Sequence, residues 1–350
     1  MTKLVAQMAT ANSTPFNSVP DDVLQRLLVG VPLGDHRAAA SACRSFRDVI
    51  NGPRFPALRR KYGFAEYGVV VVDDTLNGVL KIRMAHQNGA KATISSFFHL
   101  VEGVSTTDGA TRLFVCTWRS GPQILSLDAS SRRWRHVATL PRNYGYHSIE
   151  WHDGRLYFAG GRKLYSGHQY EYHNSLHAFD ETTGLWEELP PMPHACANAA
   201  SGVIGNELFI AGGAREGHAP YGADNAVATR TLQIYDITTR TWRFGALLPY
   251  QCYWETGVVV DEKLLVFRTA DPRHGMLAYD PQSDTWSEEA VPFVGIVEHA
   301  CAHTGRVVVF LRNGTAFERA ADGAWSPFSY GLREEDSRYE YATSGSVLLG

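Results

Sequence analysis

The stretch DETTGLW, residues 180–186, decides the fold, because its pattern returns three more times along the chain. Each copy has an Asp six residues before a Trp, and a Ser or Thr three residues after that Asp. The four copies are DASSRRW at 128–134, DETTGLW at 180–186, DITTRTW at 236–242 and DPQSDTW at 280–286, and a looser copy, ERAADGAW, ends at Trp325. Chance does not align four such segments, so the chain contains an internal repeat.

The segments between the tryptophans have the pattern of short β-strands. RLYFAGG (155–161) and ELFIAGG (207–213) are apolar runs that end at glycine pairs, and LQIYD (232–236) alternates apolar and polar residues. Each repeated Asp is expected to start a tight turn, because its carboxylate can accept hydrogen bonds from the backbone of the turn. The next strand carries the Trp, a large apolar plate suited to packing between sheets. Each period therefore predicts about four strands and no helix.

A four-stranded unit of this size cannot bury both of its faces alone, whereas units stacked around an axis can. The residues that mark the repeat are Asp128, Trp134, Gly160, Gly161, Asp180, Trp186, Gly212, Gly213, Asp236, Trp242, Asp280, Trp286 and Trp325. In its Gly-Gly pairs, its aromatic-Asp strand ends and its later tryptophans, the chain resembles the kelch-repeat family. The resemblance implies a mainly β fold, a kelch β-propeller.

The spacing of the tryptophans sets the expected number of blades. They lie 52, 56, 44 and 39 residues apart, which gives a mean period of about 48. The β-rich region 67–349 then divides into six blades, five of them marked by a Trp near 134, 186, 242, 286 and 325. The sixth blade is expected to combine residues 67–95 with a closing strand from 337–349, which would remove the open edge of the sheet.

The residues before the propeller have a different pattern. Residues 1–17 are small and polar, which predicts a disordered tail. Apolar residues then recur at helical spacing through residues 18–62, which predicts a small all-α module of three short helices. The two apolar stripes comprise Leu24, Leu27, Leu28 and Val31 in the first helix, and Ala39, Cys43, Phe46 and Ile50 in the next segment.

The helical module resembles an F-box. The matching segments, in order, are Val19-Pro20-Asp21-Asp22-Val23-Leu24, Val31-Pro32, Cys43-Arg44-Ser45-Phe46-Arg47 and Pro53-Arg54-Phe55. The sequence departs from the family's pattern at Val19, where Leu is usual, and at Phe46, where Trp is usual. Because the propeller follows directly, the chain resembles the plant F-box/kelch-repeat class along nearly its whole length.

That resemblance implies a non-catalytic receptor subunit of an SCF ubiquitin ligase. The F-box would dock on a Skp-type adaptor, which bridges to the cullin ligase core, and the propeller would hold an unknown target protein for ubiquitination and proteasomal degradation. The residues expected to contact the adaptor are Pro20, Leu24, Leu28, Val31, Pro32 and Phe46. The residues expected to fill the module's own core are Leu27, Ala39, Cys43 and Ile50.

Two long inter-strand segments, 162–174 and 214–230, are the candidate target-binding loops. Both follow a glycine pair, so we expect them to emerge on one face of the rigid ring. Tyr and Arg side chains are favoured in binding hot spots. The candidate residues are Arg162, Tyr165, His168, Tyr170, Tyr172, Arg215, His218 and Tyr221. The alternative is that both segments are insertions without a binding role.

Composition limits the other classes of function. The net charge of −3 gives no electrostatic footprint for nucleic acid, and no apolar run approaches the roughly 18 residues of a membrane span. The five cysteines are an odd number without paired spacing, which favours a reducing cytoplasmic or nuclear compartment. We therefore expect neither nucleic acid nor a membrane as a partner.

One segment resembles a metal site. His299, Cys301 and His303 point the same way if they lie on a strand. The segment falls where the innermost strand of a blade is expected, so a structural role is favoured and neither a metal nor a cofactor is predicted. Two alternatives to the ligase receptor stay open: a kelch interaction scaffold without ligase function, and, less favoured, a metalloenzyme similar to galactose oxidase.

Overall fold

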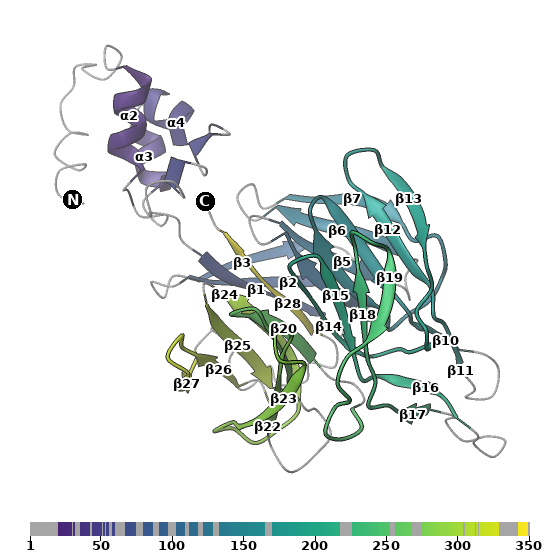
Figure 1. The fold of residues 1–350 in the computed structure, drawn as a ribbon. Coiled ribbons are helices and arrows are strands. Elements are labelled where there is room, and N and C mark those ends of the chain that lie inside the picture. Colours follow the sequence, from purple (N-terminus) through teal and green to yellow (C-terminus); the bar gives the residue numbers. More distant parts are fainter. Residues whose placement is uncertain are drawn as a thin grey trace.

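Strands dominate the computed structural model of the chain (Figure 1). The structure describes residues 20–29, 31, 36–42, 44–50, 52, 54–55, 58–59, 67–74, 80–86, 91–96, 103–108, 112–117, 122–128, 133–164, 170–217, 226–252, 256–267, 275–303, 305–311, 313, 315–328 and 342–348. The expected tail at 1–17 lies outside these residues. Within them the strands form six four-stranded sheets and two two-stranded hairpins, all antiparallel.

The sheets are numbered 1 to 6 here, and each is given in its strand order. Sheet 1 contains β28 (Ala342–Leu348), β1 (Tyr67–Asp74), β2 (Leu80–His86) and β3 (Lys91–Ser96). Sheet 2 contains β4 (Gly103–Thr107), β5 (Arg112–Thr117), β6 (Gln123–Asp128) and β7 (Arg133–Thr139). Sheet 3 contains β8 (Ser148–His152), β9 (Arg155–Ala159), β12 (Leu176–Asp180) and β13 (Leu185–Leu189).

The remaining sheets repeat this arrangement. Sheet 4 contains β14 (Ala200–Ile204), β15 (Glu207–Ala211), β18 (Leu232–Asp236) and β19 (Thr241–Phe244). Sheet 5 contains β20 (Thr256–Val260), β21 (Lys263–Phe267), β22 (Gly275–Asp280) and β23 (Thr285–Ala290). Sheet 6 contains β24 (Val297–His303), β25 (Arg306–Leu311), β26 (Ala316–Arg319) and β27 (Trp325–Pro327). The hairpins are β10 (Arg162–Leu164) with β11 (Tyr170–Tyr172), and β16 (Ala214–Glu216) with β17 (Ala226–Ala228).

One edge strand of each sheet contacts the corresponding strand of the next sheet. β4 lies against β8, β8 against β14, β14 against β20, and β20 against β24. β28 contacts both β24 and β4, so the neighbours form a closed cycle. β28 and β1 come from the two ends of the strand region, and they pair from Tyr67↔Leu348 to Asp73↔Ala342. Sheets arranged in this way around a common axis make a β-propeller.

The repeated Asp residues start the turns that the sequence predicts. The Asp180 carboxylate accepts hydrogen bonds from the backbone N–H of Thr182 at 2.9 Å and of Thr183 at 3.0 Å. Asp236 makes the same two bonds in the next sheet. These bonds stabilise the ionised carboxylate, and they lower the pKa of both Asp side chains.

Three of the repeated Trp residues, Trp186, Trp242 and Trp286, tie their sheets to the previous one. The Trp186 ring lies 5.2 Å from the Phe179 ring on the paired strand, and its Nε1 donates to the carbonyl oxygen of Thr139, at the end of β7. The equivalent bonds run from Trp242 to Pro190 at 2.8 Å and from Trp286 to Ala246 at 2.9 Å. A partly buried indole ring therefore recurs between neighbouring sheets, as the sequence predicts, and its N–H donates to the previous segment.

The glycine pairs meet a steric requirement. Gly160 and Gly161 have φ values of +68° and +106°, which side chains rarely adopt. A Cβ at Gly160 would also overlap the carbonyl oxygen of Cys196. The backbone of β9 can therefore approach the neighbouring segment only without a side chain, and the chain then turns into β10.

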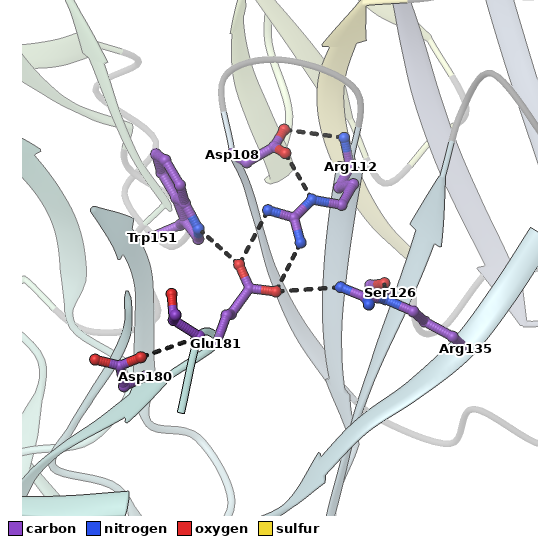
Figure 2. Close-up of polar contacts among 8 residues, drawn as sticks. Asp108, Arg112, Ser126, Arg135, Trp151, Asp180 and Glu181 are labelled. Atoms are coloured by element: carbon purple, nitrogen blue, oxygen red, sulfur yellow. Dashed lines mark hydrogen bonds and ion pairs between the residues drawn. The ribbon is translucent and has the colours of Figure 1, made fainter. Parts of the chain in front are cut away.

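A polar network joins sheets 2 and 3 (Figure 2). The guanidinium of Arg112 donates to the two carboxylate oxygens of Glu181 at 2.6 and 3.0 Å. Arg112 also bonds Asp108 at 2.8 Å, and Glu181 accepts from Trp151 Nε1 at 3.2 Å. The carboxylate of Glu181 therefore links a side chain of its own sheet to one of the neighbouring sheet.

Three short helices form a separate cluster beside the ring (Figure 1). They are α2 (Asp21–Leu28), α3 (His36–Ala42) and α4 (Arg44–Ile50). Their common core contains Leu24, Leu28, Val29, Val31, Ala39, Phe46, Val49 and Phe55. Arg59, only 1% exposed, donates to the carbonyl oxygens of Val29 and Val31, which end the first helical segment. In the part of the chain that the structure describes, no helix has the length and apolar character of a membrane span.

The structure corrects the expected division of labour within this helical module. Leu24, Leu28, Val31 and Phe46, expected on the partner-binding face, are all buried in the module's own core. Leu27, expected in the core, is 58% exposed. In the first helix the buried Leu24 and Leu28 and the exposed Leu27 are alike and lie within one helical turn, so the helical spacing of apolar residues did not show which of them is buried. Ala39 is buried as expected, and Pro32 and Cys43 lie outside the described residues.

Candidate functional site

The two hairpins form one surface on a face of the ring. β10–β11 extends from sheet 3 and β16–β17 from sheet 4, and β11 contacts β16 (Figure 1). They share a small apolar cluster of Tyr172, Ala197 and Ala214, with Tyr146, Tyr170, Ala195 and Ala226 packed against it. We call residues 162–164, 170–172, 214–216 and 226–228 the hairpin surface. The sequence placed both segments on one face, and the contact between the hairpins agrees with that expectation.

Arg162 holds the first hairpin together from inside. Its side chain is 4% exposed, and its guanidinium carbon lies 3.9 Å from the ring centre of Tyr170 and 4.5 Å from that of Tyr146. It also donates to the hydroxyl of Tyr172 at 3.3 Å. A guanidinium between two aromatic faces gains cation–π attraction in a site that is closed to water. Arg162 and the buried Tyr172 therefore position the hairpin, and their side chains are not at the surface as a direct target contact would require.

The other candidate residues divide between the surface and the segments that are not described. Tyr170 is half-buried, and Arg215 on β16 is exposed. Tyr165, His168, His218 and Tyr221 lie outside the described residues. The hairpin surface therefore offers a positive charge at Arg215 on β16 and the partly exposed ring of Tyr170 on β11.

A small pocket lies next to the hairpin surface, between sheets 2 and 3. It is lined by Leu140, Pro141, Arg142, Tyr144, His147, Phe158, Gly160, Ser175 and His177. The Tyr144 ring stacks on His173 with 3.6 Å between ring centres and 12° between ring planes. The sequence analysis missed these residues, although RNYGYH (142–147) gathers three aromatic rings and an arginine directly after a repeat proline.

His147 and Cys116 form a buried contact behind this pocket, with 3.3 Å between Nε2 and Sγ. Burial raises the pKa of the Cys116 thiol and lowers the pKa of His147 to about 4. Both groups are therefore neutral near pH 7. A nucleophilic cysteine needs a thiolate, usually stabilised by an imidazolium, and this environment opposes both charges.

The segment that resembles a metal site is built as core. Cys301 is 6% exposed and packs with Val308 and Phe310. Burial lowers the pKa of His299 to about 4, and the His303 side chain lies outside the described residues. Among the residues that the structure describes, no group of three or more His, Cys, Asp or Glu side chains is placed to hold a metal ion.

Comparisons with known proteins agree with the fold. The Kelch motif matches residues 195–246, which include Gly212, Gly213, Asp236 and Trp242. The chain is 29% identical over 171 residues to the kelch repeat and BTB domain-containing protein 12 of Danio rerio, a match that covers 44% of this chain and 27% of that protein. It is 22% identical over 229 residues to the human kelch-like protein 34, which covers 61% of this chain and 33% of that protein. The chain thus spans about a third or less of the length of these relatives.

A solved structure shows a similar arrangement of strands. The structure of YjhT matches with a TM-score of 0.50 and 17% identity, over 60% of this chain and 72% of that one. At this identity the match speaks for the fold alone. The cyclic arrangement of sheets, the kelch motif and the kelch-like relatives together support a kelch-repeat propeller protein.

Proposed function

We propose that the chain is the substrate-recognition subunit of an SCF ubiquitin ligase. The helical module binds a Skp-type adaptor, and the propeller holds a target protein for ubiquitination and proteasomal degradation in the cytoplasm or nucleus. The observation that carries the proposal is the order of the two parts: a three-helix module with its own core stands directly ahead of a kelch-repeat propeller. The receptor itself contributes no catalytic residue and no cofactor.

The exposed face of α2 is the proposed contact with the adaptor. Val23 is 40% exposed and Leu27 is 58% exposed, and these two residues lie four apart on one side of the helix. Pro20, at the start of the helix, is exposed as well. An apolar helix face of this kind fits the helix-in-groove mode of recognition. Leu24, Leu28, Val31 and Phe46 support the contact by holding the helices in place.

The ring is proposed to have six blades, one for each four-stranded sheet. Sheet 1 is the blade without a repeat Trp, and β28 and β1 close it from the two ends of the strand region. A closed ring leaves only the short outer edges of the sheets, and it provides a rigid support for the hairpin surface. Target binding is assigned to this surface because its aromatic and arginine side chains are of the types favoured in binding hot spots.

Capture by a purified Skp-type adaptor tests the proposal. The full chain is expected to be retained on the immobilised adaptor, and the chain without residues 18–60 is expected to pass through while its propeller stays folded. If the full chain is not retained, or if the shortened chain is retained equally well, the ligase role fails. A full chain that captures a target but not the adaptor would identify the interaction scaffold instead.

A further inference from the structure

The further inference starts from two equivalent positions in neighbouring sheets. Gln233 is the second residue of β18, and His177 is the second residue of β12. Gln233 is 1% exposed, and its carboxamide forms two bonds with the backbone of one residue. Its Oε1 accepts from His194 N–H at 2.8 Å, and its Nε2 donates to the His194 carbonyl oxygen at 3.1 Å. At the junction of sheets 3 and 4 the chain therefore fills this position with its own hydrogen bonds.

The junction of sheets 2 and 3 differs. His177 is 8% exposed and lines the pocket, yet its ring makes no hydrogen bond to any residue that the structure describes. Unlike Nε2 of His173, the ring nitrogens of His177 are not sealed from solvent, so a partner from solvent can reach them through the pocket. Burial lowers the pKa of His177, and the neutral imidazole still offers one N–H donor.

The other polar groups of the pocket are donors as well. Arg142 is exposed at the rim, and its guanidinium donates to the Tyr144 hydroxyl at 3.3 Å. Within the described ranges no carboxylate oxygen lies within 4 Å of the Arg142 guanidinium. By contrast, Arg155 on β9 forms an ion pair with Glu187 at 2.9 Å. The hydroxyl of Ser175 completes the set. The nearby charges are mixed. Lys163 and Arg142 are positive, and Glu171 and the exposed Glu188 are negative. Glu188 lies opposite His177 on β13 and acts electrostatically on both His177 and Arg142.

The shape of the pocket limits what can enter. The pocket is small, with room for about one water molecule or the tip of a side chain, and it opens to solvent on one side. One side is the flat stack of Tyr144 on His173, and the wall behind it contains Phe158. A compact group that accepts hydrogen bonds can enter the pocket from its open side.

We propose that this pocket is the anchoring subsite for an acidic side chain of the target protein, with its carboxylate placed between Arg142 and His177. The inference deepens the proposed function, because it assumes that the adjoining hairpin surface is where the target binds. The carboxylate accepts hydrogen bonds at the position where, at the next junction, Gln233 bonds the backbone of the protein itself. It also forms an ion pair with Arg142.

Titration of the full chain with N-acetyl-aspartate amide tests the subsite without any adaptor. The chain carries isotope-labelled histidines, and the ring signals of His173 and His177 are followed by NMR. They are expected to shift saturably with the aspartate derivative, and N-acetyl-asparagine amide is expected to bind about tenfold more weakly. Arg142→Gln and His177→Gln, the second of which copies the residue of sheet 4, should each weaken the aspartate derivative about tenfold. Arg306→Gln, at a partly exposed arginine of β25 outside the pocket and the hairpin surface, is the matched control and should leave binding unchanged.

Equal affinity for the two derivatives, or binding that survives both pocket variants, would overturn the proposal. Tighter binding of inorganic phosphate than of the aspartate derivative would assign the pocket to a different anion and would overturn it as well. The titration contains no adaptor, so the two experiments can fail independently. A negative titration rejects the pocket as an acidic subsite, and a negative adaptor capture rejects the ligase role.

Discussion

Arg112 on β5 and Glu181, the residue that follows β12, join sheets 2 and 3 through two parallel hydrogen bonds of 2.6 and 3.0 Å (Figure 2). The two residues are 69 positions apart in the sequence, and their side chains are only 25% and 12% exposed. A bidentate Arg–carboxylate pair that is mostly buried fixes both the distance and the orientation between the two sheets.

Removing the carboxylate tests the contribution of this pair. Glu181→Ala is expected to lower the free energy of unfolding by about 1–3 kcal/mol, because the largely buried Arg112 loses two hydrogen bonds and keeps only Asp108 as an ionic partner. The measurement is the urea midpoint at constant slope. Glu207→Ala is the control, because Glu207 pairs with Arg243 at a more exposed place and should cost less than about 1 kcal/mol. Equal losses in the two variants would contradict the role of the pair as a clamp between sheets.

A comparison of Gly160 with Gly154 separates two reasons for a glycine: the close approach of a neighbouring segment and the left-handed backbone conformation. Both have positive φ, +68° and +79°, but a Cβ at Gly160 would overlap Cys196, whereas a Cβ at Gly154 would meet nothing within 4 Å. Gly154→Ala is expected to cost about 1–2 kcal/mol from the left-handed backbone alone. Gly160→Ala is expected to cost about 3–5 kcal/mol, because overpacking adds to that strain. Urea unfolding of both variants checks the difference, and similar losses would show that the close approach is unimportant.

Glu150 on β8 gives the protein a stability that depends on pH. Its carboxyl accepts a hydrogen bond from Ser201 on β14 at 2.6 Å, and burial raises its pKa from 4.5 to about 7. The folded state therefore holds the proton more tightly than the unfolded chain does. Ionisation costs stability progressively between about pH 4.5 and about pH 7, and the full cost is present above that range.

The isosteric variant Glu150→Gln removes this ionisation. It is expected to leave stability below about pH 4.5 nearly unchanged and to raise stability above about pH 7 by about 1–2 kcal/mol. Unfolding curves across this range provide the test. A variant that is equally stable or less stable than the wild type above about pH 7 would show that Glu150 ionises without cost.

Phe46 tests the placement of the helical core. It is 7% exposed and packs with Leu24 and Leu28, so Phe46→Trp should overpack the module by about 1–3 kcal/mol. Hydrogen exchange of residues 21–50 in the full chain is expected to become faster. Leu27→Trp, at an exposed position of the same module, should leave exchange unchanged. Unchanged exchange in Phe46→Trp, together with tighter adaptor binding, would return Phe46 to the partner face.

Much of the propeller could be predicted from the sequence because its signals are local and repeated. The turn at Asp180 depends on a few neighbouring residues. The approach of Gly160 to Cys196 and the bond from Trp186 to Thr139 join distant segments, and the repeated motif marks where these contacts recur. Repetition then gives the same answer several times. A turn signal that recurs at a regular period therefore predicts a repeating fold before any long-range contact is known.

The helical face and the pocket could not be predicted in the same way. Leu24 and Leu27 are alike in character and close in phase, so which one is buried depends on how the helices pack. Arg162 lies between Tyr146 and Tyr170 only because the segment that joins sheets 2 and 3 folds against the first hairpin. The arrangement of the sheets in the propeller determines this contact. Residue spacing does not encode such contacts, and loop residues carry no transferable rule for the target that they bind.

Titration of the full chain with a purified Skp-type adaptor tests the central claim most directly. The account predicts saturable binding by the wild type, at least about tenfold weaker binding by Leu27→Asp, and unchanged binding by Leu247→Asp, an exposed leucine of the propeller. Absence of binding by the wild type, or equal binding by Leu27→Asp, would contradict it.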